Sequence, residues 1–392
     1  MAYYNPKDPA DYKTLLADEG FLFRYNEVSN RIEFFDPTTN QYQNYADRDM
    51  AFFRLFAKKH QMYKNDMLDS IMVLASDNRY HPIKLYFNGL QWNRQNNIKE
   101  LSSFLKADDP MICEIFLRKW FIGAVVKVYE NGLRNPVLVL DGGQNIGKST
   151  FARKLCPDPI YFQEGSIRPD EKDHEIKLTQ KLVWEIGELE NTTSKSAVGA
   201  LKDFLSRVNV SVRIPFDKYP ISQPAMTSFI GTINEMAGFL NDDSGSTRFR
   251  VLRIESIDFG YNNLDIGQCW AEAVAAYHAG ERSDLDAPTE AISNLIKQNY
   301  QVPNPIEDAI LQYFTIDPKD NQNFCTAFQI RSILLDKDYA NLGGRDYSPQ
   351  RMASTLKKLG CEKRQKWFSG NTVLQVYYGI RPKQGVYIPS LP

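Results

Sequence analysis

Histidine and cysteine, which form most zinc sites and disulfides, are scarce in this chain of 392 residues. There are four histidines, and the five cysteines lack Cys-x-x-Cys spacing: Cys113, Cys156, Cys269, Cys325 and Cys361. An odd number of scattered cysteines favours reduced thiols over a disulfide framework. We therefore expect neither a zinc site nor a disulfide-stabilised fold.

The chain also lacks a long apolar segment and an excess of charge. No apolar run approaches the ~18 residues that cross a bilayer, and the first residues, MAYYNPKDPADY, have no basic and apolar leader. Lys and Arg total 47 against 48 Asp and Glu, a net charge of -1. No overall field would draw such a protein to a membrane or to nucleic acid. We expect a cytoplasmic protein without a membrane partner, in which any polyanion site is a local patch.

The composition is that of a globular protein, and the length predicts more than one domain at ~150 residues each. The first hundred residues contain an alternating stretch at 31–36, a helical block over 47–74, and YHPIKLYFNGLQWN at 80–93, which indicates a packed turn. They contain no cluster of catalytic residue types. We expect a mixed, largely helical N-terminal domain over residues 1–105.

A different pattern occupies residues 106–285. An apolar helix is expected over 111–130, ending at Asn131-Gly132. Five β-rich runs then alternate with helical segments, at 136–141, 161–162, 181–186, 226–234 and 248–254. This alternation predicts an α/β fold with a five-stranded, largely parallel sheet covered on both faces. A helix over 266–280 completes the domain, and the polar stretch 281–290 is expected to be a linker.

The last part, residues 286–392, has helical patterns near 305–314, 326–335 and 348–359, followed by β-like runs at 363–369 and 372–380. This order is typical of a winged helix. Residues 345–392 hold nine basic and two acidic side chains, a local net charge of +7. The candidates for contacts with duplex phosphates are Arg351, Lys357, Lys358, Lys363, Arg364 and Lys366. A winged helix that docks a protein is the alternative, which the charge density disfavours.

A glycine-rich sequence directly follows the first expected strand of the sheet. GGQNIGKS, residues 142–149, fits the P-loop pattern GxxxxGK[ST] between a strand and a helix. In such a loop the backbone N–H groups bind phosphates, Lys148 reaches the β and γ phosphates, and Ser149 binds Mg²⁺. We therefore predict that ATP and Mg²⁺ are bound by Gly142, Gly143, Gln144, Asn145, Ile146, Gly147, Lys148, Ser149 and Thr150. An ordinary glycine-rich turn is the alternative.

Hydrolysis needs further groups, and the following strands supply candidates. Glu185 ends the apolar run KLVWEI, and Glu188 follows three residues later. One acid would hold the metal, with Ser149, and the other would activate water; Glu185 is the metal candidate, and the sequence does not decide which is the base. Asn234 ends the run SFIGTIN after Thr232, where an amide could orient water. A simple turn residue is the alternative for Asn234.

Together these segments resemble the virulence-associated protein E family of phage and mobile genetic elements, within the superfamily 3 helicases of the AAA+ class. The resemblance covers roughly residues 70–255, in the order YHPIKLYFNGLQWN, FIGAVVKVYENG, WEIGELE, GTINEMAGFLND and SGSTRF. It implies a AAA+ P-loop core with a fixed order of three strands. In this core the strand that ends near Asn234 would lie between the strand that precedes the Lys148 loop and the strand that ends near Glu185. The resemblance also implies an arginine finger that acts on a neighbouring subunit, with Arg248 ranked before Arg250.

The resemblance implies DNA-binding elements as well. Residues 201–224 resemble the hairpin that projects into the central channel of superfamily 3 rings. Lys218 at its tip is the preferred contact to single-stranded DNA, followed by Lys202, Arg207 and Arg213. A homo-oligomer, expected to be a hexamer, would move 3′ to 5′, bind duplex or origin DNA through its C-terminal domain, and work with a separate primase. The expected protein is an ATP-dependent replicative helicase of a phage, plasmid or genomic island, in the cytoplasm of a bacterial host.

Two other functions fit part of these features. An origin-binding initiator or DNA-dependent ATPase would remodel DNA or a partner without processive unwinding. A small-molecule kinase with a P-loop would need a substrate pocket and would ignore DNA. Stimulation of hydrolysis by DNA distinguishes the kinase from the rest, and strand displacement on a fork distinguishes the helicase from the initiator.

Overall fold

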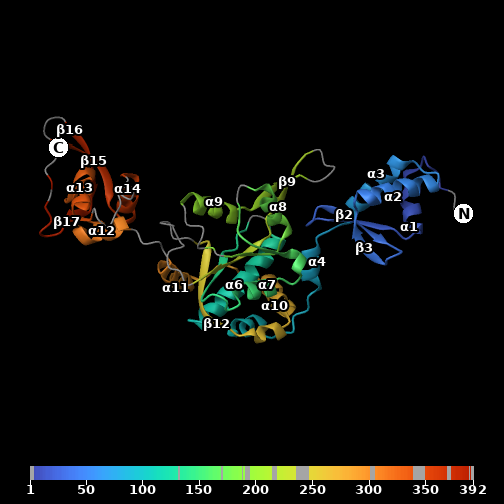
Figure 1. Ribbon diagram of the computed structural model, residues 1–392, viewed down its shortest axis with the longest axis horizontal. Helices are drawn as coiled ribbons and strands as arrows, with labels where there is room; N and C mark the ends of the chain where they lie inside the picture. Colours follow the sequence, from blue (N-terminus) through green and yellow to red (C-terminus); the bar gives the residue numbers. More distant parts are fainter. Residues whose placement is uncertain are drawn as a thin grey trace. The chain divides into compact units, whose positions relative to one another are not determined.

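The computed structural model describes residues 4–130, 133–168, 171–187, 189, 195–213, 219–234, 247–300, 305–338, 349–368, 372–387 and 389. Within these residues the protein has a mixed α/β fold with fourteen α-helices and a six-stranded mixed sheet. The chain divides into two compact units (Figure 1). The described residues of the first unit end at Tyr300, and those of the second unit begin at Pro305.

The first eighty residues pack three helices against a small sheet. The sheet has the order β3-β2-β1-β4, formed by Gln41–Asn44, Arg31–Asp36, Leu22–Asn26 and Arg79–Tyr80. The helices are α1 (Pro9–Asp18), α2 (Asp47–Lys59) and α3 (Lys64–Asp77). The predicted helical block over 47–74 is therefore helical, but it is divided into the two helices α2 and α3. The chain leaves the helix at Gln61, whose φ of 60° is left-handed and cannot continue a right-handed helix.

The stretch 80–93 also differs from its prediction. Instead of a turn it forms helix α4 (Pro82–Gly89), because proline is well suited to the first helical turn. The His81 ring nitrogen Nδ1 accepts a hydrogen bond from the Lys84 N–H at 3.2 Å and caps the helix. Helix α5 (Asn97–Ser103), β5 (Leu105–Ala107) and the predicted long helix α6 (Pro110–Tyr129) follow. Among the described helices, α6 included, none is long and apolar enough to cross a membrane.

The predicted five parallel strands are confirmed. They are β6 (Val137–Asp141), β7 (Phe162–Glu164), β8 (Val183–Ile186), β11 (Ser228–Ile233) and β12 (Phe249–Ile257). A sixth strand, β5, pairs antiparallel with β12 and was missed because it is only three residues long. The order β5-β12-β6-β11-β8-β7 places β11 between β6 and β8, as the resemblance implies.

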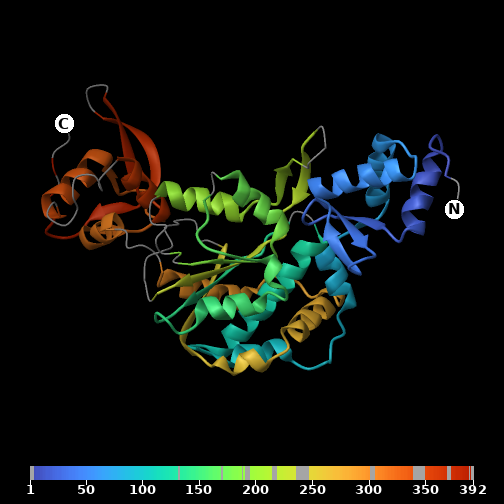
Figure 2. The ribbon, with the colours of Figure 1, turned by 45° about the vertical axis from the view of Figure 1, so that its right-hand side comes forward.

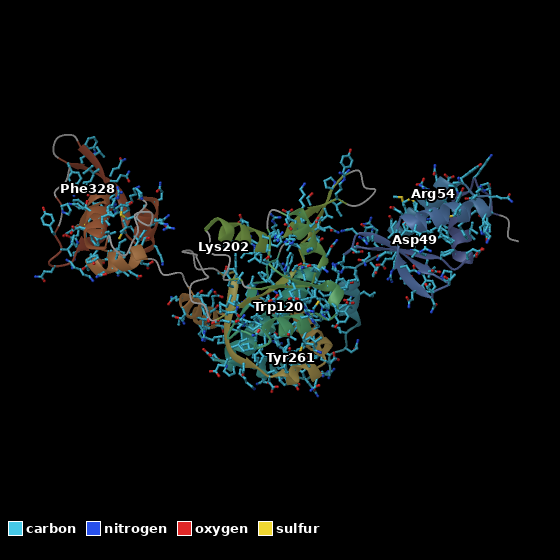
Figure 3. All side chains as sticks on the ribbon, in the orientation of Figure 1. Asp49, Arg54, Trp120, Lys202, Tyr261 and Phe328 are labelled. Atoms are coloured by element: carbon cyan, nitrogen blue, oxygen red, sulfur yellow. The ribbon has the colours of Figure 1, made fainter. Side chains whose placement is uncertain are left out.

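Alternate residues of these strands build two cores, one on each face of the sheet. Leu138 and Leu140 of β6 pack with α6, α7 (Lys148–Leu155) and α10 (Ile266–His278). Val137 and Val139 pack on the other face with α8 (Lys172–Gln180) and α9 (Lys195–Leu205). Figure 2 shows helices on both sides of the sheet. Trp120 of α6 lies inside the first core (Figure 3), where its indole N–H donates to the Phe229 carbonyl at 2.9 Å.

Three shorter features complete the first unit. Strands β9 (Asn209–Val212) and β10 (Ile221–Pro224) pair as the two arms of the predicted hairpin. Among the described residues, short 3-10 helices cover Pro159–Tyr161 and Phe259–Asn263. The expected linker at 281–290 is partly wrong, because helix α11 (Ala287–Gln298) begins within it. The Asp286 carboxylate accepts the Thr289 N–H at 2.9 Å, and this cap starts the helix.

The second unit contains the predicted three helices and two long strands. The helices are α12 (Pro305–Tyr313), α13 (Ala327–Asp338) and α14 (Pro349–Lys358). Strands β15 (Glu362–Phe368) and β16 (Thr372–Tyr378) form an antiparallel sheet with the short β14 (Phe324–Thr326). A further pair joins β13 (Phe314–Ile316) to β17 (Ile380–Pro382). One core, which includes Ile310, Leu334, Leu356 and Tyr377, holds the helices against the strands.

Candidate functional site

The loop of residues 142–147 joins β6 to α7 at the carboxyl edge of the parallel strands. Two of its glycines are required by geometry. A Cβ on Gly142 would lie 2.3 Å from the Ile254 carbonyl oxygen. Gly147 has a φ of 97°, and a Cβ there would lie 2.8 Å from the Phe259 ring. Asn145, with a φ of 64°, uses the tolerance of asparagine for left-handed backbone, so the loop turns tightly before α7.

Lys148, the first residue of α7, points back under this loop. Its ammonium donates to the carbonyl oxygens of Gly142 and Gly143, both at 2.7 Å, and to Asn234 Oδ1 at 3.1 Å. The side chain is 6% exposed. Asn234 directly follows β11, the strand beside β6. The structure therefore joins the loop lysine to the strand-end amide, as the resemblance implies.

Glu185 of β8 is buried beside the same helix. Its Oε1 accepts hydrogen bonds from Ser149 Oγ at 3.0 Å and from Thr232 Oγ1 at 2.7 Å. Burial raises the pKa of Glu185, while these two hydrogen bonds oppose the rise. Helix α7 and the neighbouring strands β8 and β11 thus bring one carboxylate and two hydroxyls into a single hydrogen-bonded set.

The burial of Glu185 leads to a stability prediction. The pKa of Glu185 is raised in the folded protein, so folding disfavours the charged carboxylate. The free energy of unfolding therefore falls as the pH rises through the folded-state pKa of Glu185. Glu185→Gln keeps the shape and a hydrogen-bond acceptor but removes the charge. We expect the free energy of unfolding to increase by about 1 kcal/mol at mildly alkaline pH, with a smaller gain in acid, measured by urea denaturation.

Glu164→Gln is the matched control for this measurement, because Glu164 lines the same cavity but its side chain is 47% exposed. Its replacement should change the free energy of unfolding by less than about 0.5 kcal/mol. A Glu185→Gln protein that is less stable than the wild type at every pH would show that the carboxylate stabilises the fold, contrary to this account.

A cavity of about 680 Å³ opens beside these residues. Six of the nine predicted loop residues line it: Gln144, Asn145, Gly147, Lys148, Ser149 and Thr150. Glu185, Thr232 and Asn234 line it as well. Gly142 and Gly143 contribute carbonyls to Lys148 behind the wall, and Ile146 packs against the apolar core. The volume lies within the range of small-molecule sites.

The oxygen donors of this cavity fit a magnesium ion. Ser149 Oγ and Glu185 Oε1 lie 3.0 Å apart. Mg²⁺ takes oxygen ligands and is usually held by one or two protein groups together with phosphates and water. Among the described residues no group of three or more His, Cys, Asp and Glu side chains could hold a metal ion. Glu188, the second predicted acid, lies outside the described residues.

Two features of the site were not indicated by sequence patterns. Phe259 is 53% exposed, lines the cavity and contacts the loop at Gly147, but it follows β12, far from the loop in the chain. Asp141, at the end of β6, is 0% exposed and accepts hydrogen bonds from Tyr300 at 2.6 Å and Arg253 at 2.9 Å. Burial raises the pKa of Tyr300. The sequence near Asp141 does not indicate that Tyr300 and Arg253, which are distant in the chain, are its partners.

The two candidate finger arginines differ in exposure. Arg250 is 6% exposed, and its guanidinium donates to the Ser283 carbonyl at 3.0 Å. Burial lowers the pKa of Arg250 to about 10. Arg248 is half-buried, and its Nε donates to Ser206 Oγ at 2.9 Å. Since a finger has to reach another subunit, this difference favours Arg248.

The predicted DNA contacts near the hairpin occupy different settings. Lys218 lies outside the described residues. Lys202 is half-buried on α9 (Figure 3), and Arg213 is exposed just after β9. Arg207 forms an ion pair with Glu175 and lies over the Phe204 ring at 5.5 Å. This pairing gives Arg207 a role within the fold.

The basic candidates of the second unit fall into two groups. Lys357 on α14 and Lys363 on β15 are exposed, and Arg351 is half-buried on α14. Lys358 pairs with Glu307 at 2.7 Å and Arg364 pairs with Glu362, while Lys366 lies over the Phe324 ring at 3.8 Å. Sequence counts of charge could not separate these groups.

Comparisons with known proteins identify the family of this chain. Two solved structures are similar at low identity. The A form apo structure of the NrS-1 C terminal region has 11% identity and a TM-score of 0.49, covering 95% of this chain and 100% of that one. The apo structure of the same region has 12% identity and a TM-score of 0.48, covering 95% and 99%. No curated protein matches. The model of the virulence-associated protein E-like domain matches residues 87–302, more than half of the chain, and the protein belongs to this family.

Proposed function

We propose that this protein is an ATP-dependent DNA helicase of superfamily 3, with a AAA+ core that assembles as a ring of six copies. One observation carries the proposal. Lys148 and Ser149 come from α7, Glu185 from β8 and Asn234 from the position after β11, yet all four border one cavity. That cavity lies at the carboxyl edge of parallel strands, where open α/β sheets bind their ligands.

The side chains of the cavity suit binding and hydrolysis of ATP. The loop N–H groups and Lys148 would bind the β and γ phosphates. Phosphate oxygens would then take the place of the Gly142 and Gly143 carbonyl oxygens as acceptors for the Lys148 ammonium. Ser149 and Glu185 would hold Mg²⁺, which neutralises charge on the phosphates when bound. Thr232 fixes the orientation of the Glu185 carboxylate. Asn234, beside Lys148, would orient the attacking water, and Glu188 is the candidate base.

The position of Arg248 supports action on a neighbouring subunit. Its carbonyl accepts the Val137 N–H at 2.7 Å, so Arg248 lies at the start of β6. The loop that would hold the phosphates follows the other end of β6, after Asp141. At ~3.3 Å per residue, the two ends of this strand are about 13 Å apart. Arg248 would therefore complete the nucleotide site of an adjacent copy.

DNA would be bound by both units. The arms β9 and β10 support a hairpin whose Lys218 would contact single-stranded DNA in the channel. The order α12, β14, α13, α14, β15, β16 supports a winged helix in the second unit, with Lys357 and Lys363 facing duplex or origin phosphates. Such a protein would work in the replication of a phage, plasmid or genomic island inside a bacterial host, with a separate primase.

The test of this function is strand displacement on forked DNA. We expect the protein to separate a labelled strand from a fork only with a hydrolysable nucleotide and Mg²⁺, and single-stranded DNA to stimulate phosphate release. Strand separation is measured by gel or fluorescence and hydrolysis by a phosphate assay. Stimulated hydrolysis without strand displacement would indicate an origin-binding initiator or remodelling ATPase. Hydrolysis that ignores DNA would indicate a small-molecule kinase and overturn the proposal.

A further inference from the structure

A tryptophan of the second unit is strongly exposed at the end of β15. Trp367 is the penultimate residue of this strand, and its side chain is 71% exposed. Val373, directly opposite on β16, is 39% exposed. Within the described part of the chain, the indole contacts no other aromatic ring and no cation. The exposed indole therefore offers a flat apolar face on which another planar group can stack.

Strand alternation shows which face of the sheet carries this ring. Lys363, Gln365 and Trp367 lie on one face of β15, and Lys363 pairs with Tyr377 of β16. Tyr377 is 3% exposed in the core between the sheet and the helices. The ring of Trp367 therefore lies on the face of the sheet that packs against the helices, at a position that the helices do not bury. Helix α14, with the exposed Lys357, packs against the same strand.

The segment of the second unit that contains Trp367 is rich in basic residues. The described residues from 349 to 387 hold eight basic side chains and one acidic side chain. On the opposite face of β15, Lys366 lies over Phe324 at 3.8 Å and Arg364 over Tyr378 at 5.0 Å. These cation–π contacts hold β15 in place beside the exposed ring. A flat apolar surface on a basic segment is complementary to a nucleobase flanked by phosphates.

We propose that Trp367 stacks on the exposed base at a junction between duplex and single-stranded DNA, while Lys357 and Lys363 bind phosphates of the adjoining duplex. Bases inside a duplex are covered on both faces by their neighbours, whereas the last base pair at a fork has one open face. An indole can cover that face without reading its sequence. The inference deepens the proposed function and rests on it, since it names the DNA structure that the second unit recognises.

The experiment compares two DNA substrates with the full chain, using fluorescence anisotropy and competition. One is a fork, and the other is a relaxed, covalently closed circular duplex, which has no open base face. We expect Trp367→Ala to weaken fork binding about tenfold and binding to the closed duplex less than about twofold, because stacking on one base is lost. Lys363→Ala should weaken both, because phosphates are present in both.

Two matched variants separate stacking from a loss of structure. Trp367→Phe keeps an aromatic face and should retain most of the preference for the fork. Tyr387→Ala removes another ring of this unit, 79% exposed, and should leave both affinities unchanged. Thermal midpoints equal to the wild type would show that the exposed positions do not affect folding.

The outcomes are distinguishable. Equal losses on both substrates would place Trp367 inside duplex DNA as a wedge, and no loss on either would leave it as a protein contact; both overturn the junction proposal. A wild-type protein that binds neither substrate would overturn DNA binding by the second unit itself. That result would refute the proposed function, whereas an indifferent Trp367→Ala protein refutes the inference alone.

Discussion

Replacing Lys148 by alanine is expected to lower the rate of ATP hydrolysis at least about a hundredfold, because a preorganised cation at the transferred phosphoryl group contributes that much or more. The ammonium lies where the loop carbonyls and the Asn234 amide converge. Among the described residues that line the cavity, Lys148 is the only cationic one. None of the other described residues that line the cavity could replace its charge, so phosphate release measured with saturating nucleotide should fall to background.

Lys154→Ala is the matched control, since Lys154 lies on the same helix and donates to the Asn262 carbonyl at 3.2 Å. Its activity should stay within about twofold of the wild type. Binding of duplex DNA by the second unit should survive in the Lys148→Ala protein. If that variant does not fold, Lys148→Met keeps the apolar stem and removes only the charge. Normal turnover in either folded variant would overturn the assignment of the site.

Much of the fold could be predicted because its strands and helices have clear hydrophobic periods. The apolar runs that end at Asp141, Ile186 and Ile233 form β6, β8 and β11, as expected. The errors arose where single residues outweigh the period. Gln61 breaks a helix that apolar spacing continues, and Pro82 starts a helix where proline and glycine together indicated a turn. Such effects depend on backbone angles and caps, which periodicity does not record.

The candidate site divides in the same way. Residues that follow apolar strands, such as Glu185 and Asn234, could be found because parallel strands end at one edge of a sheet. Phe259 and the pair Asp141–Tyr300 could not, because their contacts join segments that are distant in the chain. Pairings such as Lys358 with Glu307 also escape a count of charges. Long-range contacts therefore account for most of what the sequence left undetermined.

The second large effect is expected at Arg248. Arg248→Ala should lower ATP hydrolysis by roughly 10³-fold or more, as is typical of an arginine finger that acts between subunits. The side chain lies at the opposite end of β6 from its own loop, so the loss should come from the neighbouring copy's site. The rate of wild-type hydrolysis should accordingly rise with protein concentration as rings assemble, which a phosphate assay over a dilution series measures.

Mixing two inactive proteins tests this arrangement directly. An Arg248→Ala subunit keeps Lys148, and a Lys148→Ala subunit keeps Arg248, so one interface between them contains both groups. In a head-to-tail ring mixed in equal amounts, about a quarter of the interfaces should be intact. Phosphate release should therefore recover to a measurable fraction of the wild-type rate, although neither protein is active alone.

Arg250 provides the control for this experiment because it is buried and bonded to the Ser283 carbonyl. Arg250→Ala should lower the thermal midpoint, since it leaves that carbonyl without its donor and opens a cavity. The folded fraction should keep its activity, and mixing with Lys148→Ala subunits should add nothing. If Arg248→Ala alone retained turnover, or if mixed rings formed without recovery, hydrolysis would take place within one subunit and the proposed ring mechanism would be wrong.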